Sequence, residues 1–274
     1  MDDLVTGKWL QAHLDEVQPL DASFFLPAHE RDANAEFEAG HIPGALRLDI
    51  GSFADPDHPA PHMLPSPELG AQMLESIGLR RDKPIIVYDN SPLRTATRGW
   101  FIVRHYGAAE AAVLDGGFGK WTAEGRPVES GPARVRTGLW PVTAAQLEVV
   151  TKSDILAGTT PPVADARGPE RFAGTTPEPR AGMAAGHIPG AKNLPYSKFY
   201  AEGGTLKSQD ELRQVFVDAG MDPSAAFTAS CGSGVTACSI LFAAHLLGGR
   251  EGKLYDGSWA EWGADPTTPK EQGS

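Results

Sequence analysis

The sequence predicts an α/β protein built from two tandem domains, each a mostly parallel sheet flanked by helices. Three observations support this fold class. The chain has 274 residues, enough for two domains that each bury a core. Several short motifs occur twice, in the same order. In both halves short apolar runs alternate with longer helical patterns, and strands that alternate with helices form parallel sheets covered on both faces.

The duplicated motifs place the two domains along the chain. The first motif, Ala-Gly-His-Ile-Pro-Gly-Ala, and the dipeptide Asp-Ala are unchanged between their copies, and the third motif is similar. The copies lie about half the chain apart, which indicates tandem domains and not a solenoid of short repeats. The paired segments are 39–45 with 185–191, 21–22 with 165–166, and 114–118 with 255–259, the last pair followed by Trp121 and Trp262.

A linker is expected between the two copies. Residues 125–134 are rich in glycine, proline and polar side chains, a composition typical of connecting segments. We therefore expect the first domain and its linker over residues 1–136 and the second domain over residues 137–274.

Apolar runs predict the same order of elements in each half. A continuous apolar run of about four to eight residues is typical of a buried strand, and a longer one of a helix. The helix expected in the second half is strongly apolar and ends at Gly248-Gly249, because glycine ends helices readily. The expected elements are a strand at 84–88, a helix at 98–105 and a strand at 113–114 in the first half, and a strand at 225–230, a helix at 235–247 and a strand at 253–255 in the second.

Composition and charge narrow the partners and the location. The formal net charge is −11, which disfavours nucleic acid and anionic membranes as partners. No run approaches the ~18 apolar residues of a membrane span. Cys231 and Cys238 are too far apart for a disulfide if they share one helix. Reduced thiols and the absence of a signal sequence predict a cytoplasmic protein, and the scarcity of cysteines and clustered histidines predicts no metal and no cofactor.

Cys231 is the candidate nucleophile. It directly follows the strand expected at 225–230 and precedes the helix expected at 235–247. Reactive loops in parallel sheets lie at this end of the strands. The cysteine is therefore expected at the edge of the sheet where chemistry takes place.

The residues after Cys231 predict an anion-binding loop. Glycines allow a tight bend in which backbone N–H groups converge, and the start of the following helix adds positive potential. Hydroxyl groups can donate further hydrogen bonds. These features favour a thiolate and would stabilise an anionic persulfide. The loop is expected to comprise Gly232, Ser233, Gly234, Val235 and Thr236.

Two other interpretations of Cys231 are a buried structural cysteine and the nucleophile of a cysteine phosphatase. The position between a strand and a helix, with glycine at 232 and 234, disfavours a purely structural cysteine. A phosphatase needs an arginine, which clamps phosphate with two hydrogen bonds, at the position that Ala237 occupies. The phosphatase interpretation is therefore poor.

Three motifs together resemble the two-domain sulfurtransferases of the rhodanese superfamily over nearly the whole chain. The duplicated Gly-His-Ile-Pro-Gly-Ala string resembles a signature of each rhodanese-like domain, 231–236 resembles the cysteine loop of 3-mercaptopyruvate sulfurtransferases, and 256–259 resembles the C-terminal signature. The resemblance implies two rhodanese-like domains and a ping-pong reaction. In it, Cys231 takes sulfur from a small-molecule donor and passes it, as a persulfide, to a thiol such as thioredoxin or a small thiol, or to cyanide.

The first domain cannot perform this reaction. It has no cysteine, and Asp89 follows its strand at the position that Cys231 takes in the second domain. The first domain therefore resembles the inactive N-terminal domain of the family, and the second is expected to be the catalytic one.

The residues around the site favour 3-mercaptopyruvate as the donor, with pyruvate as product. Thiosulfate is a compact dianion, and enzymes that use it carry basic side chains just after the cysteine, where this chain has Gly232 and Ser233. The segment from Arg171 to Arg180 resembles the substrate loop of mercaptopyruvate enzymes, which implies that both arginines bind the donor. Arginine suits this role because its planar group binds carboxylates bidentately. Two solvated surface arginines are the alternative.

The resemblance also implies a proton relay that is incomplete in this chain. Ser233 and His62 match the serine and histidine of the family's relay, but the acidic member falls at Gly51, which cannot orient a histidine. If no relay operates, His62 is expected only to line the site. Nearby acids that could compensate are Asp49, Asp55 and Asp57.

Three functional hypotheses follow: a 3-mercaptopyruvate sulfurtransferase, a thiosulfate:cyanide sulfurtransferase, and a non-catalytic rhodanese-like module that binds partners or senses redox state. The intact cysteine loop disfavours the third. Structural roles are expected for His41, His187, Asp165 and Arg167, and Cys238 is expected in the core.

Overall fold

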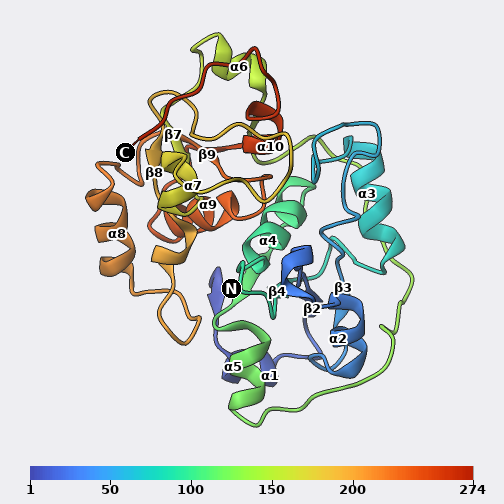
Figure 1. The fold of residues 1–274 in the computed structure, drawn as a ribbon. Coiled ribbons are helices and arrows are strands. Elements are labelled where there is room, and N and C mark those ends of the chain that lie inside the picture. The colour runs from blue at the N-terminus through green and yellow to red at the C-terminus, as the bar shows by residue number, and fades with distance from the viewer. Residues whose placement is uncertain (274) are drawn as a thin grey trace. The chain divides into compact units, whose positions relative to one another are not determined.

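The computed structural model describes residues 1–273. The chain forms two compact units, and Figure 1 labels most of their elements. Each unit is built mainly from one copy of the repeat and takes one short segment from the other half of the chain. The first unit comprises residues 1–55, 64–147 and 202–206, and the second comprises residues 56–63, 148–201 and those from 207 onward.

The first unit contains a five-stranded sheet in the order β1-β5-β4-β2-β3, and every neighbouring pair is parallel. The strands are β1 (Leu4–Val5), β2 (Gln18–Asp21), β3 (Leu46–Arg47), β4 (Ile85–Tyr88) and β5 (Ala111–Leu114). The helices are α1 (Gly7–Ala12), η1 (Pro27–His29), α2 (Ala33–Ala39), α3 (Pro67–Ser76), α4 (Ala96–His105) and α5 (Gly117–Ala123).

Helices cover both faces of this sheet, because alternate residues of a strand point to opposite sides. Ile86 and Tyr88 of β4 belong to a core cluster with residues of α1, α2 and α5. On the opposite face α4 packs against β4 and β5. Gly99 lets α4 approach closely, since a Cβ at this position would lie 2.7 Å from both Ala22 Cβ and Val87 Cγ1. The central strand β4 is consequently buried throughout.

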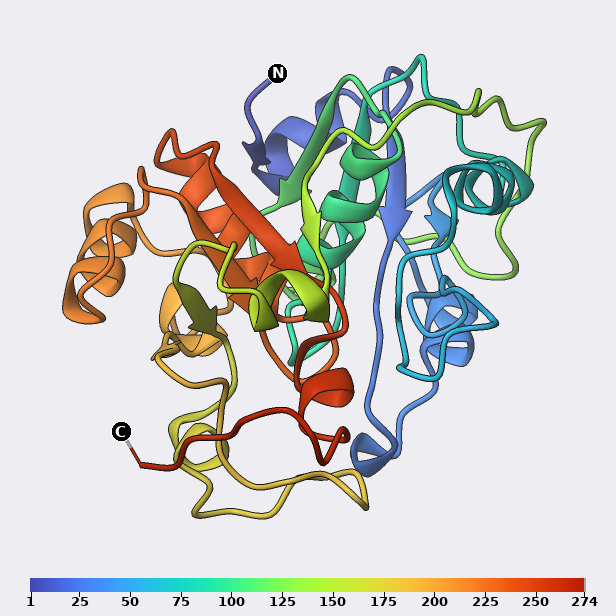
Figure 2. The ribbon, with the colours of Figure 1, turned by 90° about the horizontal axis from the view of Figure 1, so that it is seen from above.

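The second unit repeats this topology, with the order β6-β10-β9-β7-β8 and parallel pairing throughout. In Figure 2 the strands β9 and β10 run side by side in orange to red. The strands are β6 (Val149–Val150), β7 (Val163–Asp165), β8 (Lys192–Asn193), β9 (Phe227–Ser230) and β10 (Gly252–Tyr255). The helices are α6 (Lys152–Leu156), α7 (Pro169–Ala173), η2 (Tyr196–Phe199), α8 (Gln209–Asp218), α9 (Ala237–Leu246) and α10 (Ser258–Trp262).

In both units, a glutamate further along the chain forms the same hydrogen bonds with the duplicated motif. The backbones of His41 and Glu129 exchange two hydrogen bonds of 2.8 and 2.9 Å, and the Glu129 carboxylate accepts from the Gly44 N–H at 2.9 Å. Glu271 repeats these contacts with His187 and Gly190. Part of the segment expected to be a linker therefore belongs to the fold of the first unit.

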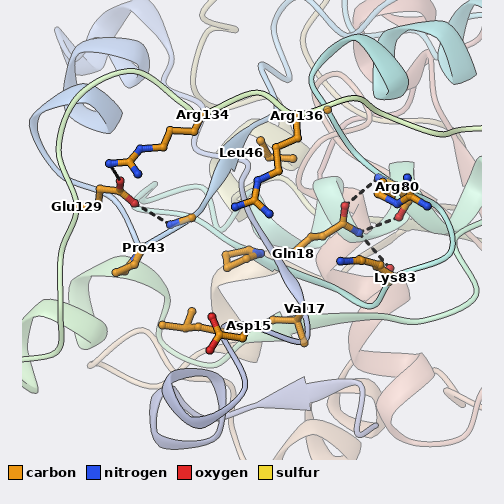
Figure 3. A pocket seen from close by; sticks show the side chains of 14 residues that line it. Asp15, Val17, Gln18, Pro43, Leu46, Arg80, Lys83, Glu129, Arg134 and Arg136 are labelled. Atoms are coloured by element: carbon orange, nitrogen blue, oxygen red, sulfur yellow. Dashed lines mark hydrogen bonds and ion pairs between the residues drawn. The ribbon is translucent and has the colours of Figure 1, made fainter.

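The same segment borders a cavity of about 350 Å³ in the first unit. Figure 3 shows Arg134 from this segment and the nearby Arg136 on one side of it and Gln18 at its centre. The Gln18 amide donates to the carbonyl oxygens of Arg80 and Lys83 and accepts from the Arg80 N–H, so its polar atoms are satisfied. The cavity lies at the amino end of β2, the opposite end of the strand from the loops expected to carry chemistry.

The predicted fold class is confirmed, and most of the expected elements are present. The strand expected at 225–230 begins at Phe227, and the helix expected at 98–105 begins two residues earlier, at Ala96. The helix expected from Val235 begins at Ala237, because the preceding residues turn around the cysteine. Within residues 1–273, no helix has the length and apolar character needed to span a membrane.

Candidate functional site

Cys231 lies directly after β9, the central strand of the second sheet. It is a free thiol, and only 1% of the residue is exposed. The carboxyl ends of parallel strands are where ligands bind in this class of fold. The thiol therefore lies buried at the carboxyl edge of the sheet, where ligands are expected to bind.

The backbone of the cysteine loop is tied to the start of α10. Trp259 N–H donates to the Cys231 carbonyl at 3.0 Å, and Ala260 N–H donates to the Gly232 carbonyl at 2.8 Å. Gly234 has a φ of +74°, and a Cβ there would lie 2.6 Å from Asp256 Oδ1. Only glycine fits this turn, since both the backbone angle and the close carboxylate exclude a side chain.

Ser258 is a functional residue that the sequence does not single out. Its hydroxyl accepts hydrogen bonds from the N–H groups of Cys231 (3.0 Å) and Gly234 (3.1 Å) and donates to the Tyr255 carbonyl (2.8 Å). Ser258 is fully buried, with a φ of +50°. One signal was available: Ser258 lies in the third duplicated motif, where the first copy has Gly117.

These contacts show which N–H groups of the cysteine loop already have an acceptor. Those of Cys231 and Gly234 donate to Ser258, and α9 begins only at Ala237. Among residues 1–273, no protein acceptor receives a hydrogen bond from the remaining four N–H groups. Those four groups can therefore bind an anion beside the thiol. They belong to Gly232, Ser233, Val235 and Thr236.

His62 and Ser233 lie together within the second unit. His62 Nδ1 is 3.0 Å from Ser233 Oγ, and 6% of His62 is exposed. His62 has a φ of +62°, a conformation that histidine adopts more readily than most residues. Asp49, one of the acids expected to compensate for Gly51, instead accepts from the Gly51 N–H and the Ser52 hydroxyl. The Asp49 carboxylate therefore stabilises the turn formed by residues 49–52.

Arg171, on α7, lies beside the cysteine loop. A Cβ built on Gly232 would be 3.2 Å from Arg171 Nη2. The guanidinium is held by Glu178, with Nη2 to Oε2 at 2.5 Å and Nε to Oε1 at 3.3 Å. The Arg171 side chain is 31% exposed, so a ligand can still reach it.

Arg180 is the second arginine of this segment and lies exposed, within reach of the charge on Arg171. Although Arg180 is exposed, partial desolvation by the surrounding protein, together with the positive charge of Arg171, lowers the pKa of its guanidinium. In the part of the chain that the structure describes, no carboxylate pairs with its guanidinium. Two guanidinium groups that repel each other form a favourable place for an anionic group.

A family model described as the rhodanese-like domain matches residues 6–124 and 151–265. The chain belongs to the rhodanese family. The chain is 38% identical to the 3-mercaptopyruvate sulfurtransferase of Escherichia coli, over 97% of both sequences, and 38% identical to the thiosulfate sulfurtransferase of Gallus gallus, over 94% and 92%. The crystal structure of the 3-mercaptopyruvate enzyme SseA from Escherichia coli covers 94% of this chain and 99% of its own, with 36% identity and a TM-score of 0.85.

These relatives confirm the resemblance seen in the sequence and the predicted enzyme class, a sulfurtransferase. Several structural expectations are also confirmed. His41 and His187 each donate from Nδ1 to a carbonyl oxygen at 2.8 Å and stack on a phenylalanine, as structural residues do. Arg167 pairs with Asp165, and Cys238 is fully buried.

Asp89 takes the place of the cysteine in the first rhodanese-like domain. It follows the central strand β4, and its carboxylate accepts hydrogen bonds from the N–H groups of Ser91 (2.8 Å) and Ala96 (2.6 Å). Burial raises the pKa of Asp89 to about 6, although these two hydrogen bonds oppose the rise. In the first domain, the N–H groups of the equivalent loop therefore bind the Asp89 carboxylate of the domain itself.

Replacing Ser258 should disrupt the cysteine loop. The Ser258→Ala variant leaves the buried N–H groups of Cys231 and Gly234 without an acceptor, and each such loss costs about 1–3 kcal/mol. We expect a lower thermal midpoint and a fall in sulfurtransferase rate of at least about tenfold. Steady-state kinetics and thermal unfolding measure both effects. A variant with unchanged rate would show that the loop keeps its shape without this hydroxyl.

Asp89 should make the first domain less stable as the pH rises. Between pH ~4 and ~6 the folded protein holds a proton on Asp89 that the unfolded chain has lost, so the free energy of unfolding falls as pH increases. The fall should be on the order of 3 kcal/mol and should level off above pH ~6. Urea unfolding across this range measures it. Asp89→Asn should lack this fall, and equal slopes in both proteins would contradict the assignment.

Proposed function

We propose that this chain is a 3-mercaptopyruvate sulfurtransferase that carries sulfur as a persulfide on Cys231. The observation that carries the proposal is the cysteine loop itself. The thiol lies at the end of the central strand, beside four N–H groups that have no protein acceptor in the described chain. Such a loop stabilises a thiolate before the reaction and an anionic persulfide after it.

The first half-reaction transfers one sulfur atom. The Cys231 thiolate attacks the sulfur of 3-mercaptopyruvate, a sulfur–sulfur bond forms, and the carbon–sulfur bond breaks. The electrons of the broken bond remain on carbon as the enolate of pyruvate, which takes up a proton and leaves as pyruvate. The thiol proton of the donor stays on the outer sulfur or is released.

The second half-reaction regenerates the thiolate. An acceptor thiolate, from thioredoxin or a small thiol, or cyanide attacks the outer sulfur of the persulfide, and Cys231 leaves as thiolate. The acceptor becomes a persulfide or thiocyanate. Both cysteines of the chain are free, which supports a reducing, cytoplasmic location for this exchange.

Arg171 and Arg180 are proposed to bind the donor. Arg171 lies beside Gly232, and Arg180 has a guanidinium that no carboxylate of residues 1–273 neutralises. The carboxylate and keto oxygen of mercaptopyruvate are acceptors only, which suits two guanidinium groups. With these groups bound, the sulfur of the donor can point toward Cys231.

Ser233 and His62 are proposed to assist catalysis by moving or holding a proton near the donor. Their 3.0 Å contact links a hydroxyl of the cysteine loop to an imidazole. Because the acidic position of the family falls at Gly51, we propose that His62 and Ser233 act without help from that position. General acid–base help is worth roughly 10²–10⁴-fold, so replacing His62 should slow the reaction without abolishing it.

We propose a division of labour between residues 1–136 and 137–274. The second domain carries Cys231 and both arginines, whereas the first has Asp89 in the equivalent loop. Thiosulfate is the alternative donor, supported by the similarity to the Gallus gallus enzyme. The neutral residues Gly232 and Ser233 favour the monoanion mercaptopyruvate over this dianion. A non-catalytic role would not account for the N–H groups beside Cys231 that have no protein acceptor within residues 1–273.

Steady-state rates with both donors test the proposal. Wild type should prefer mercaptopyruvate, and Cys231→Ser should lose all turnover while Cys238→Ser, a matched buried cysteine, retains it. Arg180→Ala should raise the KM for mercaptopyruvate by about tenfold or more, because a charge-assisted hydrogen bond is lost. Arg213→Ala, an exposed arginine on α8, should not.

Each part of the proposal can fail separately. Turnover in Cys231→Ser would exclude the persulfide on this residue. A wild-type preference for thiosulfate would overturn the choice of donor. An Arg180→Ala variant with an unchanged KM would leave Arg180 as a solvated surface arginine.

A further inference from the structure

Glu178 lies between two arginines next to the cysteine loop. Its side chain is 5% exposed, and its carboxylate accepts from Arg167 Nη1 at 2.8 Å and from Arg171 Nη2 at 2.5 Å. Buried carboxylates need such partners, because an unpaired buried charge is costly. The two arginines are therefore fixed by one acid.

Arg167 is already neutralised from its other side. Its Nε and Nη2 donate to the Asp165 carboxylate at 2.7–3.1 Å, and its guanidinium stacks on the Trp259 ring at 4.4 Å. Burial opposes its charge, but Asp165 and Glu178 more than offset this effect and raise the pKa of Arg167. Arg167 thus stays charged and holds the Glu178 carboxylate in place through their ion pair.

The charged side chains around Glu178 carry one more positive charge than negative charges. Asp165 balances Arg167, and Glu178 balances Arg171, whereas Arg180 has no carboxylate partner in residues 1–273. We name these five residues the arginine cluster. Its net charge of one matches a monoanionic donor such as mercaptopyruvate and undercompensates a dianion such as thiosulfate.

We propose that Glu178 sets the donor preference, because it neutralises Arg171 and holds its guanidinium beside Gly232. This inference rests on the proposed donor-binding role of Arg171 and Arg180. Glu178 itself touches no reacting atom, so it is a positioning and charge-setting residue. Gly232 is part of the arrangement, since a Cβ there would lie 3.2 Å from Arg171 Nη2.

Replacing Glu178 by glutamine should change the two donors differently. The substitution raises the charge of the arginine cluster from one to two and loosens Arg171. A dianion gains twice as much as a monoanion from the added charge. We expect the ratio of kcat/KM for thiosulfate to kcat/KM for mercaptopyruvate to rise about tenfold, mainly through KM, and the shift to shrink at high salt.

Glu170→Gln is the matched control. Glu170 is an exposed acid in the first turn of the same helix as Arg171, and its loss changes the net charge of the chain equally. The ratio should change by less than about twofold, because exposed charges are screened. Glu178→Asp retains the charge with a shorter side chain and should keep the wild-type ratio even if both rates fall.

Several results would overturn the inference. Equal losses with both donors in Glu178→Gln would assign Glu178 a purely structural role. A shift of equal size in Glu170→Gln would show that only the overall charge matters. If Glu178→Gln fails to fold, a changed ratio in Glu178→Asp would contradict the inference, and an unchanged ratio would support it.

The experiment separates this inference from the proposed function. If wild type does not use mercaptopyruvate, the proposed donor is wrong, but Glu178→Gln should still lower the KM for thiosulfate. If wild type prefers mercaptopyruvate and the ratio is unchanged in Glu178→Gln, only the inference fails. Calorimetric binding of pyruvate and of sulfate to Cys231→Ser gives the same comparison without turnover: removal of the Glu178 charge should strengthen sulfate binding more than pyruvate binding.

Discussion

The arrangement of the site depends on the hydroxyl of Ser258, which holds the turn after β9. By accepting from Cys231 and Gly234 and donating to Tyr255, it fixes the backbone on both sides of the cysteine. The other four N–H groups of the loop have no protein acceptor among residues 1–273. A preorganised set of donors stabilises a developing anion without reorganisation during the reaction. In the proposed reaction, the position of Cys231 therefore depends on a residue held entirely inside the protein.

The two domains show how one fold supports different outcomes. Both have five parallel strands in the same order and the same closing contacts around the duplicated motif. In the first, Asp89 occupies the loop with its own carboxylate, and burial raises its pKa to about 6. In the second, Cys231 follows the equivalent strand as a free thiol, and Arg171 and Arg180 add positive charge in a chain whose net charge is −11. The same fold therefore presents a buried carboxylate in one domain and a buried thiol in the other.

The sequence predicts most of the fold, because long apolar runs such as 84–88 and the duplicated motifs carry strong local signals. It also places Cys231 correctly between a strand and a helix. The sequence could not show that Ser258 holds the loop, since this contact joins residues distant along the chain. It could not assign Glu178, because the path of the segment between Arg171 and Arg180 depends on the buried pair of Arg167 and Asp165. Glu129 lies in a stretch with linker composition, and only its pairing with His41 reveals that it is structural.

The central claim is that Cys231 carries the transferred sulfur. Mass spectrometry of the protein after reaction with 3-mercaptopyruvate, without an acceptor, tests this claim most directly. We predict the added mass of one sulfur atom on the peptide that contains Cys231, equimolar pyruvate in solution, and loss of that mass when an acceptor thiol is added. Added sulfur on Cys238, or pyruvate formation in a protein whose Cys231 never gains sulfur, would contradict the account.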